Sequence, residues 1–230
     1  MSEVKPTDHA LAGHAVYTKT VLTIYDAWVH GMSNPLIWRC PTTHLRKLYD
    51  CQVSWNHMDM GVGTGYFLDR CTFPSPRPRL VLVDANQNSL EVAARRLHRY
   101  RPMLYRRDVL QPLNIDGPPF DSIGLMYVLH CLPGDLAAKA VVLDNLNAFL
   151  APAGVLFGAT ILSGGVYANR AARKLMQIYN AKGIFSNADD HLDALRAVLA
   201  ETFAEVQIDV VGCVALFSVR RPKRVCLARV

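Results

Sequence analysis

The chain has 230 residues, of which 51% are hydrophobic and 19% are charged. This length predicts one compact α/β domain with a well-buried core and leaves little room for a second domain. No apolar stretch approaches the ~20 residues that cross a bilayer, and residues 1–8 lack the pattern of a secretory signal. We therefore expect a soluble, cytoplasmic protein without membrane insertion, as a monomer or homodimer.

The formal net charge of +6 raises the question of an anionic partner such as a nucleic acid. The basic residues are dispersed apart from clusters in 95–101, 106–107 and 220–224, and no aromatic-interleaved RNA-reading signature accompanies them. A solvated basic surface is therefore favoured over nucleic-acid binding. The six cysteines show no close pairing and no zinc-ligand spacing, so we expect reduced thiols and no metal site.

The first 50 residues predict a helical cap. Apolar and aromatic residues recur at helical spacing in 14–32, with Gly31 as the expected end, and a second helix is predicted from Pro41 through Tyr49. In 51–161 strand and helix patterns then alternate, which indicates a mostly parallel sheet with helices on both faces. The predicted strands are 80–83, 104–107, 121–127 and 154–161, and the predicted helices are 65–71, 87–99 and 135–150.

The remaining segment, 162–230, departs from this alternation. Two helices are predicted, over 167–181 and 189–203, followed by strands over 205–211 and 214–219. Only Gly212 and Cys213 separate these strands, a turn short enough for a hairpin that would add an antiparallel strand to the sheet.

A glycine-rich turn is the clearest sign of a binding site. Asp59 precedes a Gly-x-Gly-x-Gly sequence formed by Gly61, Gly63 and Gly65, and glycines permit positive φ and a close ligand approach. A phosphate-binding loop is the competing interpretation, but a carboxylate repels phosphate, and the dinucleotide fingerprint needs GxGxxG. The pattern therefore favours a nucleoside that carries an amino acid.

Further polar groups follow the next strands. Asp84 ends the predicted strand 80–83, at roughly the ~20-residue offset of a ribose-binding acid. Asp108 follows the next strand and suits an exocyclic amine, and Tyr127 opens into Val128-Leu-His-Cys-Leu-Pro133.

With these features in this order, residues 50 to 160 resemble the class I S-adenosylmethionine-dependent methyltransferases. The resemblance implies an α/β, Rossmann-like doubly wound seven-stranded sheet, mostly parallel with one antiparallel strand, in a single domain. It also implies that the first motif holds the methionine part of the cofactor, with the ribose, the adenine and the floor of the site served by the following strand ends. The implied cofactor-binding residues are Asp59, Gly61, Gly63, Gly65, Asp84, Ala85, Asp108, Val109 and Tyr127.

The cap offers further candidates, because aromatic faces attract a sulfonium cation. Tyr25 and Trp38 are expected to line the site, with Tyr17 as a further candidate, whereas helix packing is the favoured alternative for Trp28. Arg39 is a candidate partner for the cofactor's carboxylate, or a surface residue.

Methyl transfer from a sulfonium is a direct displacement that positioning alone can accelerate. His130 is the candidate catalytic base, with a structural histidine as the equal alternative. Because the cap is apolar and aromatic, we expect a small organic acceptor, methylated at oxygen, nitrogen or carbon, in specialised metabolism. Three alternatives stay open: a cyclase or rearrangement enzyme that retains the cofactor, an interaction protein with a degenerate pocket, and an RNA methyltransferase.

Overall fold

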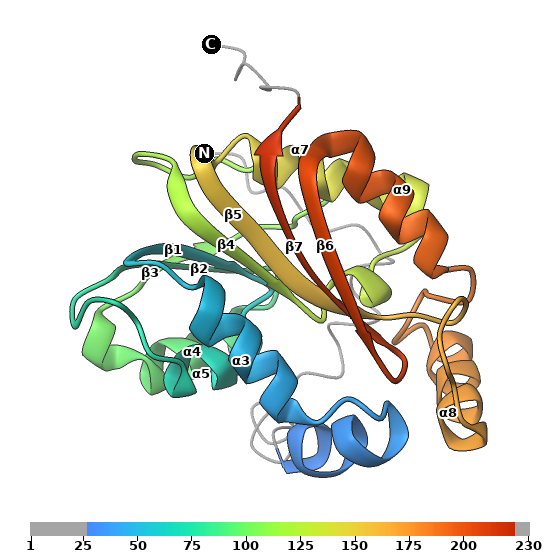
Figure 1. The fold of residues 1–230 in the computed structure, drawn as a ribbon. Helices are drawn as coiled ribbons and strands as arrows, with labels where there is room; N and C mark the ends of the chain where they lie inside the picture. The colour runs from blue at the N-terminus through green and yellow to red at the C-terminus, as the bar shows by residue number, and fades with distance from the viewer. Residues whose placement is uncertain (1–26, 224–230) are drawn as a thin grey trace.

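The computed structural model of the protein describes residues 27–223, with side chains from residue 32 onward. Seven strands of this part form one sheet in the order β3-β2-β1-β4-β5-β7-β6 (Figure 1). The strands are β1 Asn56–Met60, β2 Arg79–Asp84, β3 Met103–Arg106, β4 Phe120–Met126, β5 Leu150–Ile161, β6 Phe203–Val211 and β7 Val214–Pro222.

The strand order reverses between β1 and β4. β1 pairs in parallel with β2 on one side and with β4 on the other, so the chain builds outward to β3 and then returns to the middle of the sheet. β7 is antiparallel to both of its neighbours, β5 and β6. The expected Rossmann-like sheet with one antiparallel strand is confirmed, and open sheets of this kind bind ligands at the carboxyl ends of the strands beside the reversal.

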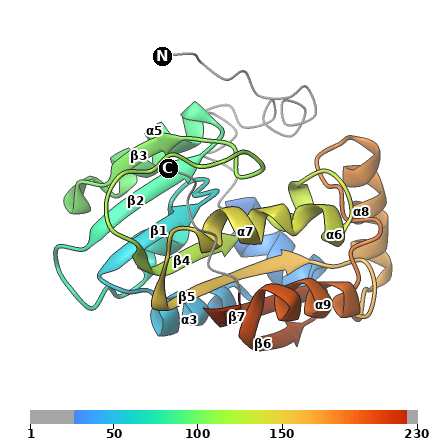
Figure 2. The ribbon, with the colours of Figure 1, turned by 90° about the horizontal axis from the view of Figure 1, so that it is seen from above.

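Helices cover both faces, because a parallel strand that is apolar on both sides must be buried on both. In β2, Leu80 and Leu82 pack into one core cluster while Val81 and Val83 pack into the other. The first cluster takes residues from α3 Thr42–Gln52, α4 Tyr66–Arg70, α5 Gln87–Arg96 and α8 Arg170–Ala181, and the second from α6 Leu136–Lys139, α7 Val141–Asn147 and α9 Leu192–Thr202. In Figure 2, α7 and α9 lie in front of the strands and α3 lies behind β5.

The described part of the cap begins with η1 Ala27–Ile37, a π-helix. The prediction that Gly31 ends this helix is wrong, because η1 continues through both Gly31 and Pro35. Its end is held by a bond from the Trp38 backbone N–H to the Ser33 carbonyl, at 3.0 Å. The i→i+5 hydrogen bonding of a π-helix is rare, and no residue propensity predicts it. Gly31 was therefore a misleading sign of a helix end. The second cap helix is confirmed as α3, which runs to Gln52.

The prediction of one helix over 135–150 is also wrong. The segment forms two short helices, α6 and α7, and β5 already begins at Leu150. The backbone carbonyl of Phe149 accepts a hydrogen bond from Phe120 N–H. Because this segment pairs with the start of β4, the helix ends before it. A register shift between Phe120 and Ser122 absorbs the extra residues before Val155.

Most other elements match their predictions, with shifted ends. α8 begins at Arg170 because the side chain of Asn169 caps it by accepting from Ala172 N–H at 2.7 Å. α5 ends at Arg96, and a 3₁₀ turn, η2 His98–Tyr100, follows it. The predicted hairpin is confirmed by β6 and β7. No helix in the described range 27–223 has the length and apolar character to span a bilayer.

Candidate cofactor site

The glycine-rich turn links β1 to α4, and its three glycines all have positive φ. A Cβ at Gly61 (φ 71°) would collide with Val128 Cγ2, and one at Gly65 (φ 71°) would lie 3.2 Å from Ala93 Cβ on α5. A Cβ at Gly63 (φ 56°) would meet no described atom within 4 Å. Gly61 and Gly65 therefore allow close packing of the loop, whereas Gly63 leaves open space on the main chain where a ligand can lie.

Asp84 joins this loop to the end of β2. Its Oδ2 accepts from Gly63 N–H at 3.1 Å and its Oδ1 from Asn86 N–H at 2.8 Å. The side chain is buried, and burial raises the pKa of Asp84 to about 6, although the N–H groups of Asn86 and Gly63 lower it. Each carboxylate oxygen has two acceptor positions, so both can also accept ribose hydroxyls.

Asp59 lies under the loop near the end of β1 and is 2% exposed. Its Oδ2 accepts from Tyr49 Oη at 2.7 Å and lies 3.3 Å from His57 Nε2. The structure therefore places a buried carboxylate beside the turn, as predicted, and adds two neighbours from α3 and β1. Whether Asp59 contacts the cofactor stays a prediction.

Asp108 begins the loop after β3, next to Asp84. Arg107 N–H donates to the Asp84 carbonyl at 3.2 Å, and Asp108 Oδ1 accepts from Leu110 N–H at 3.0 Å. The neighbouring Val109 is buried and Ala85 is half-buried. The fold thus brings the predicted ribose and adenine residues to adjacent strand ends, although their contacts with a ligand stay predictions.

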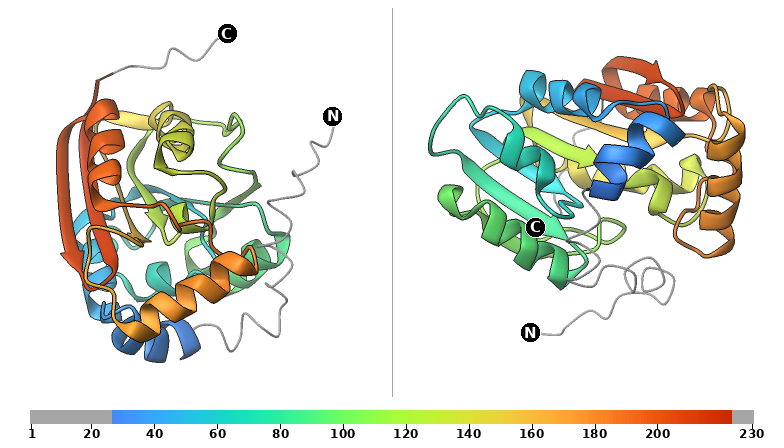
Figure 3. Two further views of the ribbon diagram at one scale, coloured as in Figure 1. Left: turned by 90° about the vertical axis from the view of Figure 1, so that its right-hand side faces the viewer. Right: turned by 90° about the horizontal axis from the view of Figure 1, so that it is seen from below.

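Tyr127 follows β4 with a positive φ of 59°, a strained conformation for a residue with a large side chain. Its backbone N–H donates to the Ala159 carbonyl at 2.8 Å, and its Oη donates to Asn34 Oδ1 on η1 at 3.2 Å. This bond ties the cap to the floor of the site, where η1 lies beside the end of β4 (right panel of Figure 3). Since strain of this kind clusters at functional sites, it supports a role for Tyr127.

A row of rings continues from Tyr127 towards the cap. His130 lies 5.6 Å from Tyr127, Phe185 lies 4.5 Å from His130, and Trp38 lies 5.9 Å from Phe185, measured between ring centroids. Tyr179 of α8 packs on Phe185 at 4.9 Å. Trp38 is 2% exposed, so the row forms a packed wall between the floor of the site and the cap.

His130 is buried, and its surroundings disfavour a charged ring. Burial and the nearby Lys139 ammonium lower the pKa of His130 to about 3. Its Nδ1 accepts from Ile161 N–H at 3.4 Å, an arrangement that leaves the proton of the neutral ring on Nε2. These observations favour the structural alternative, and catalysis by His130 stays a prediction.

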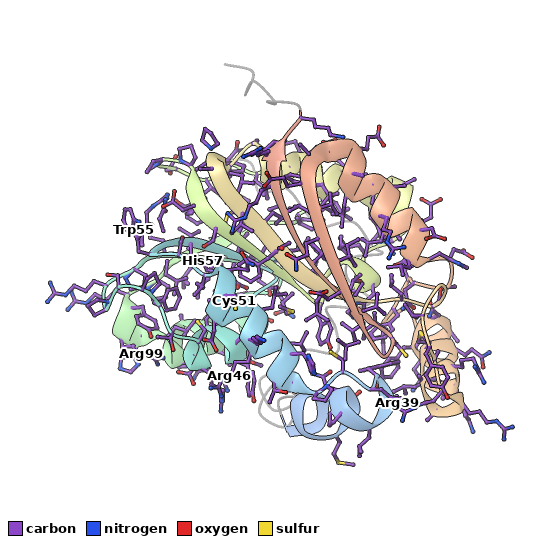
Figure 4. All side chains as sticks on the ribbon, in the orientation of Figure 1. Arg39, Arg46, Cys51, Trp55, His57 and Arg99 are labelled. Carbon is purple, nitrogen blue, oxygen red and sulfur yellow. The ribbon has the colours of Figure 1, made fainter. Side chains whose placement is uncertain are left out.

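Arg39 is exposed and its guanidinium carbon lies 5.6 Å from the ring centroid of Tyr167 (Figure 4). This contact favours the surface alternative, and pairing with the cofactor stays a prediction. Tyr17 and Tyr25 lie outside the described residues, as does the side chain of Trp28.

Four residues near the site were missed by sequence reasoning: Asn34, Tyr49, His57 and Phe185. Tyr49 and Phe185 approach the site only through tertiary packing, so no spacing signal marks them. His57 did carry a signal, because a histidine two residues before Asp59 in a buried strand lies on the same strand face.

The donor set fits S-adenosylmethionine, the cofactor that the resemblance implies. Asp84 has oxygens that can accept from ribose hydroxyls, Gly63 leaves the main chain open, and Asp59 is a carboxylate beside the turn that suits a ligand with an ammonium and a sulfonium group. Within 27–223, no group of three or more His, Cys, Asp or Glu side chains is arranged to hold a metal ion.

Comparisons with known proteins agree. The family model of a methyltransferase domain matches residues 58–156. Demethylluteothin O-methyltransferase of Streptomyces thioluteus is 42% identical over 92% of this chain and 94% of that protein. A physcion biosynthesis cluster O-methyltransferase of Aspergillus chevalieri is 37% identical over 97% of this chain and 100% of that protein.

Among solved structures, the N-methyltransferase NodS of Bradyrhizobium japonicum WM9, in complex with S-adenosyl-L-homocysteine, has the same fold. Its TM-score is 0.56 at 19% identity, over 79% of this chain and 85% of that chain. With the fold, the glycine turn and these relatives in agreement, the chain belongs to the class I S-adenosylmethionine-dependent methyltransferases.

Proposed function

We propose that this S-adenosylmethionine-dependent methyltransferase of small organic molecules transfers the methyl group to an oxygen atom, and that its acceptor is a hydroxyl-bearing specialised metabolite. Two observations support this proposal. Two of the relatives are named demethylluteothin O-methyltransferase and physcion biosynthesis cluster O-methyltransferase, and the candidate site borders the aromatic wall of Tyr127, His130, Phe185 and Trp38.

The observation that carries the cofactor assignment is the open face of Gly63 beside Asp84. When bound, the cofactor supplies an electrophilic methyl group. Asp84 would orient the ribose through its two oxygens, and Gly63 would let the ligand approach the main chain. Asp108 and Val109 would flank the adenine, and Tyr127 would form the floor below the reacting atoms.

In this proposal the protein accelerates transfer mainly by positioning, because a direct displacement needs the nucleophile, the methyl carbon and the sulfur in line. The packed wall residues would exclude water from this side of the site and give the acceptor an apolar boundary. His130, as a neutral ring with its proton on Nε2, would donate a hydrogen bond more readily than it would accept a proton.

The test is incubation of the purified protein with isotopically labelled cofactor and a metabolite extract, followed by mass spectrometry. We expect labelled methyl ethers together with an equal amount of S-adenosyl-L-homocysteine. Label on nitrogen or carbon would contradict O-methylation. Turnover of an acceptor without S-adenosyl-L-homocysteine would instead indicate the cyclase or rearrangement reaction.

A cytoplasmic location and a monomeric or homodimeric state are further proposals. The described cysteines, Cys40, Cys51, Cys71, Cys131 and Cys213, are all free, which suits a reducing compartment. Cell fractionation and sedimentation of the purified protein test the two points.

A further inference from the structure

A buried chain of hydrogen bonds extends from Asp59 away from the ligand side. His57 Nε2 lies 3.3 Å from Asp59 Oδ2, and His57 Nδ1 lies 2.8 Å from Ser122 Oγ. Ser122 Oγ lies 2.8 Å from Ser54 Oγ, which donates to the Asn56 carbonyl at 2.9 Å. His57 and Ser122 are fully buried, so neither touches solvent. Figure 4 labels His57, which lies on β1.

The strand register builds this chain. His57 and Asp59 lie on one face of β1, and their partners across the sheet on β4 are Ser122 and Gly124. A Cβ at Gly124 would lie 2.8 Å from Asp59 Oδ2, so only glycine leaves room for the carboxylate. The chain of bonds is therefore a product of four positions in two strands that meet at the reversal of the sheet.

The contact with Asp59 decides which nitrogen of the His57 ring needs a proton. A carboxylate only accepts hydrogen bonds, so the 3.3 Å contact between His57 Nε2 and Asp59 Oδ2 is favourable when Nε2 carries a proton. Tyr49 Oη supplies the second bond to the same oxygen, and burial together with the Asp59 carboxylate raises the pKa of Tyr49, which keeps this donor protonated. On the other side of the ring, His57 Nδ1 contacts Ser122 Oγ. Ser122 Oγ in turn accepts a hydrogen bond from the backbone N–H of Ser54 at 2.9 Å.

Both donors reach Oδ2, and no hydrogen bond between residues of the described range 27–223 ends on Asp59 Oδ1. Every buried side-chain nitrogen or oxygen in this range has a hydrogen-bond partner, so Oδ1 belongs to the small accessible part of the side chain and is open to a hydrogen-bond donor from a ligand. S-adenosylmethionine carries both of its positive centres at the amino-acid end. A carboxylate on β1, one strand from the ribose candidate Asp84 on β2, is placed to meet that end.

We propose that His57 is a positioning residue for cofactor binding: its Nε2–H fixes the Asp59 carboxylate so that Oδ1 accepts a hydrogen bond from the ammonium group at the amino-acid end of the cofactor. The proposal rests on the cofactor assignment made above and not on the atom that is methylated. The competing explanation is that His57 only satisfies buried polar groups in the core.

Calorimetric binding of two ligands separates these explanations. S-adenosyl-L-homocysteine has the amino-acid end, and 5′-deoxy-5′-methylthioadenosine keeps the nucleoside but lacks it. The variant is His57→Phe, because the ring already packs among Phe73, Phe157 and Tyr49 at centroid distances of 6.3, 5.8 and 6.4 Å. We expect about a tenfold or greater loss of affinity for S-adenosyl-L-homocysteine and an affinity for the truncated ligand within about twofold of wild type.

The matched control is Asp84→Ala, which should weaken both ligands because both contain the ribose. His57→Gln keeps an N–H donor and should bind S-adenosyl-L-homocysteine more tightly than His57→Phe does. An equal loss for both ligands in His57→Phe, or no loss, would overturn the role of His57.

If His57→Phe does not fold, Ser122→Ala is the second variant. We expect it to lose affinity for S-adenosyl-L-homocysteine selectively, by a smaller factor than His57→Phe.

The wild-type protein gives an independent readout by nitrogen-15 NMR of the His57 ring, where we expect a protonated, slowly exchanging Nε2. An unprotonated Nε2 would contradict the proposal. Failure to find a methyl ether product would overturn O-methylation but leave the binding pattern of the variants unchanged.

Discussion

Asp84, the residue proposed to hold the ribose, joins the glycine turn to the end of β2 through one carboxyl group. Burial raises its pKa to about 6, and its two oxygens already accept from Gly63 and Asn86 N–H groups. Ribose hydroxyls that donate to this group favour its ionised form, because a carboxylate is the stronger acceptor. If Asp84 holds the ribose as proposed, cofactor binding and ionisation of Asp84 are linked.

The expected result is that affinity for S-adenosyl-L-homocysteine is constant above about pH 6 and falls as the pH drops below it, by at most about tenfold per pH unit. Asp84→Asn cannot titrate there, so its affinity should be flat across this range and lower above pH 6 by ~1.5 to 3 kcal/mol. Calorimetry between pH 5 and pH 8 tests this, and a wild-type affinity independent of pH would contradict it.

His130 provides the opposite case, a buried base that stays neutral. Its pKa is lowered to about 3, whereas an unfolded histidine titrates near ~6.5. The unfolded chain therefore binds a proton in this interval that the folded chain does not. The contribution of His130 to stability is complete above about pH 6.5 and is lost as the pH falls towards 3, at up to ~1.4 kcal/mol per pH unit.

We expect His130→Gln to lose less unfolding free energy than wild type between pH 7 and pH 5, measured in urea. His98→Gln, a change at an exposed histidine, is the control and should behave as wild type. His130→Gln also tests catalysis. Removal of a general base lowers turnover by ~10² to 10⁴, whereas we expect His130→Gln to lower turnover by less than about tenfold. A larger loss would restore His130 as the base.

At the scale of elements, a buried ion pair fixes the segment that carries Phe185. Lys139 of α6 donates to both carboxylate oxygens of Asp190, at 2.9 and 2.7 Å, and to the Ser186 carbonyl at 2.6 Å. Both side chains are 1% exposed. This pair joins α6 to the loop before α9 and so holds Phe185 against His130.

Lys139→Met should destabilise the protein by ~3 to 5 kcal/mol, because it leaves the Asp190 carboxylate buried and unpaired. The double variant Lys139→Met with Asp190→Leu should recover most of this loss, since two apolar side chains replace the pair. Chemical denaturation of both variants provides the measurement. A cost below ~1 kcal/mol for Lys139→Met would show that the pair is not needed.

Element prediction succeeded where local pattern and tertiary structure agreed. The strand 80–83 and the 205–219 hairpin were correct because buried β-branched runs and a two-residue turn specify them. The predicted end of η1 and the predicted helix over 135–150 were wrong for different reasons. The end of η1 depends on a local π-helical bond from Trp38 N–H to the Ser33 carbonyl, which no residue propensity encodes. A distant backbone group decides the other segment. Pairing with Phe120 starts β5 at Leu150, and no local signal encodes that contact.

Across the whole molecule, the site forms where the sheet reverses its order between β1 and β4. The sequence predicted that the glycines and the three aspartates lie at successive strand ends, and the fold places them there because motif spacing along the chain maps onto the parallel strands. Their contacts with the cofactor stay predictions. The sequence did not predict the buried neighbours of Asp59, nor the Lys139–Asp190 pair, because their partners meet only when the elements pack. The division into cap, core and C-terminal segment stays a prediction.

The most direct test of the account is a crystal structure of the protein with S-adenosyl-L-homocysteine bound. We expect the ligand across the carboxyl ends of β1 and β2, with its ribose hydroxyls on Asp84, its chain over Gly63 and its ammonium on Asp59 Oδ1. A ligand bound elsewhere, or bound here with its ribose away from Asp84, would contradict it.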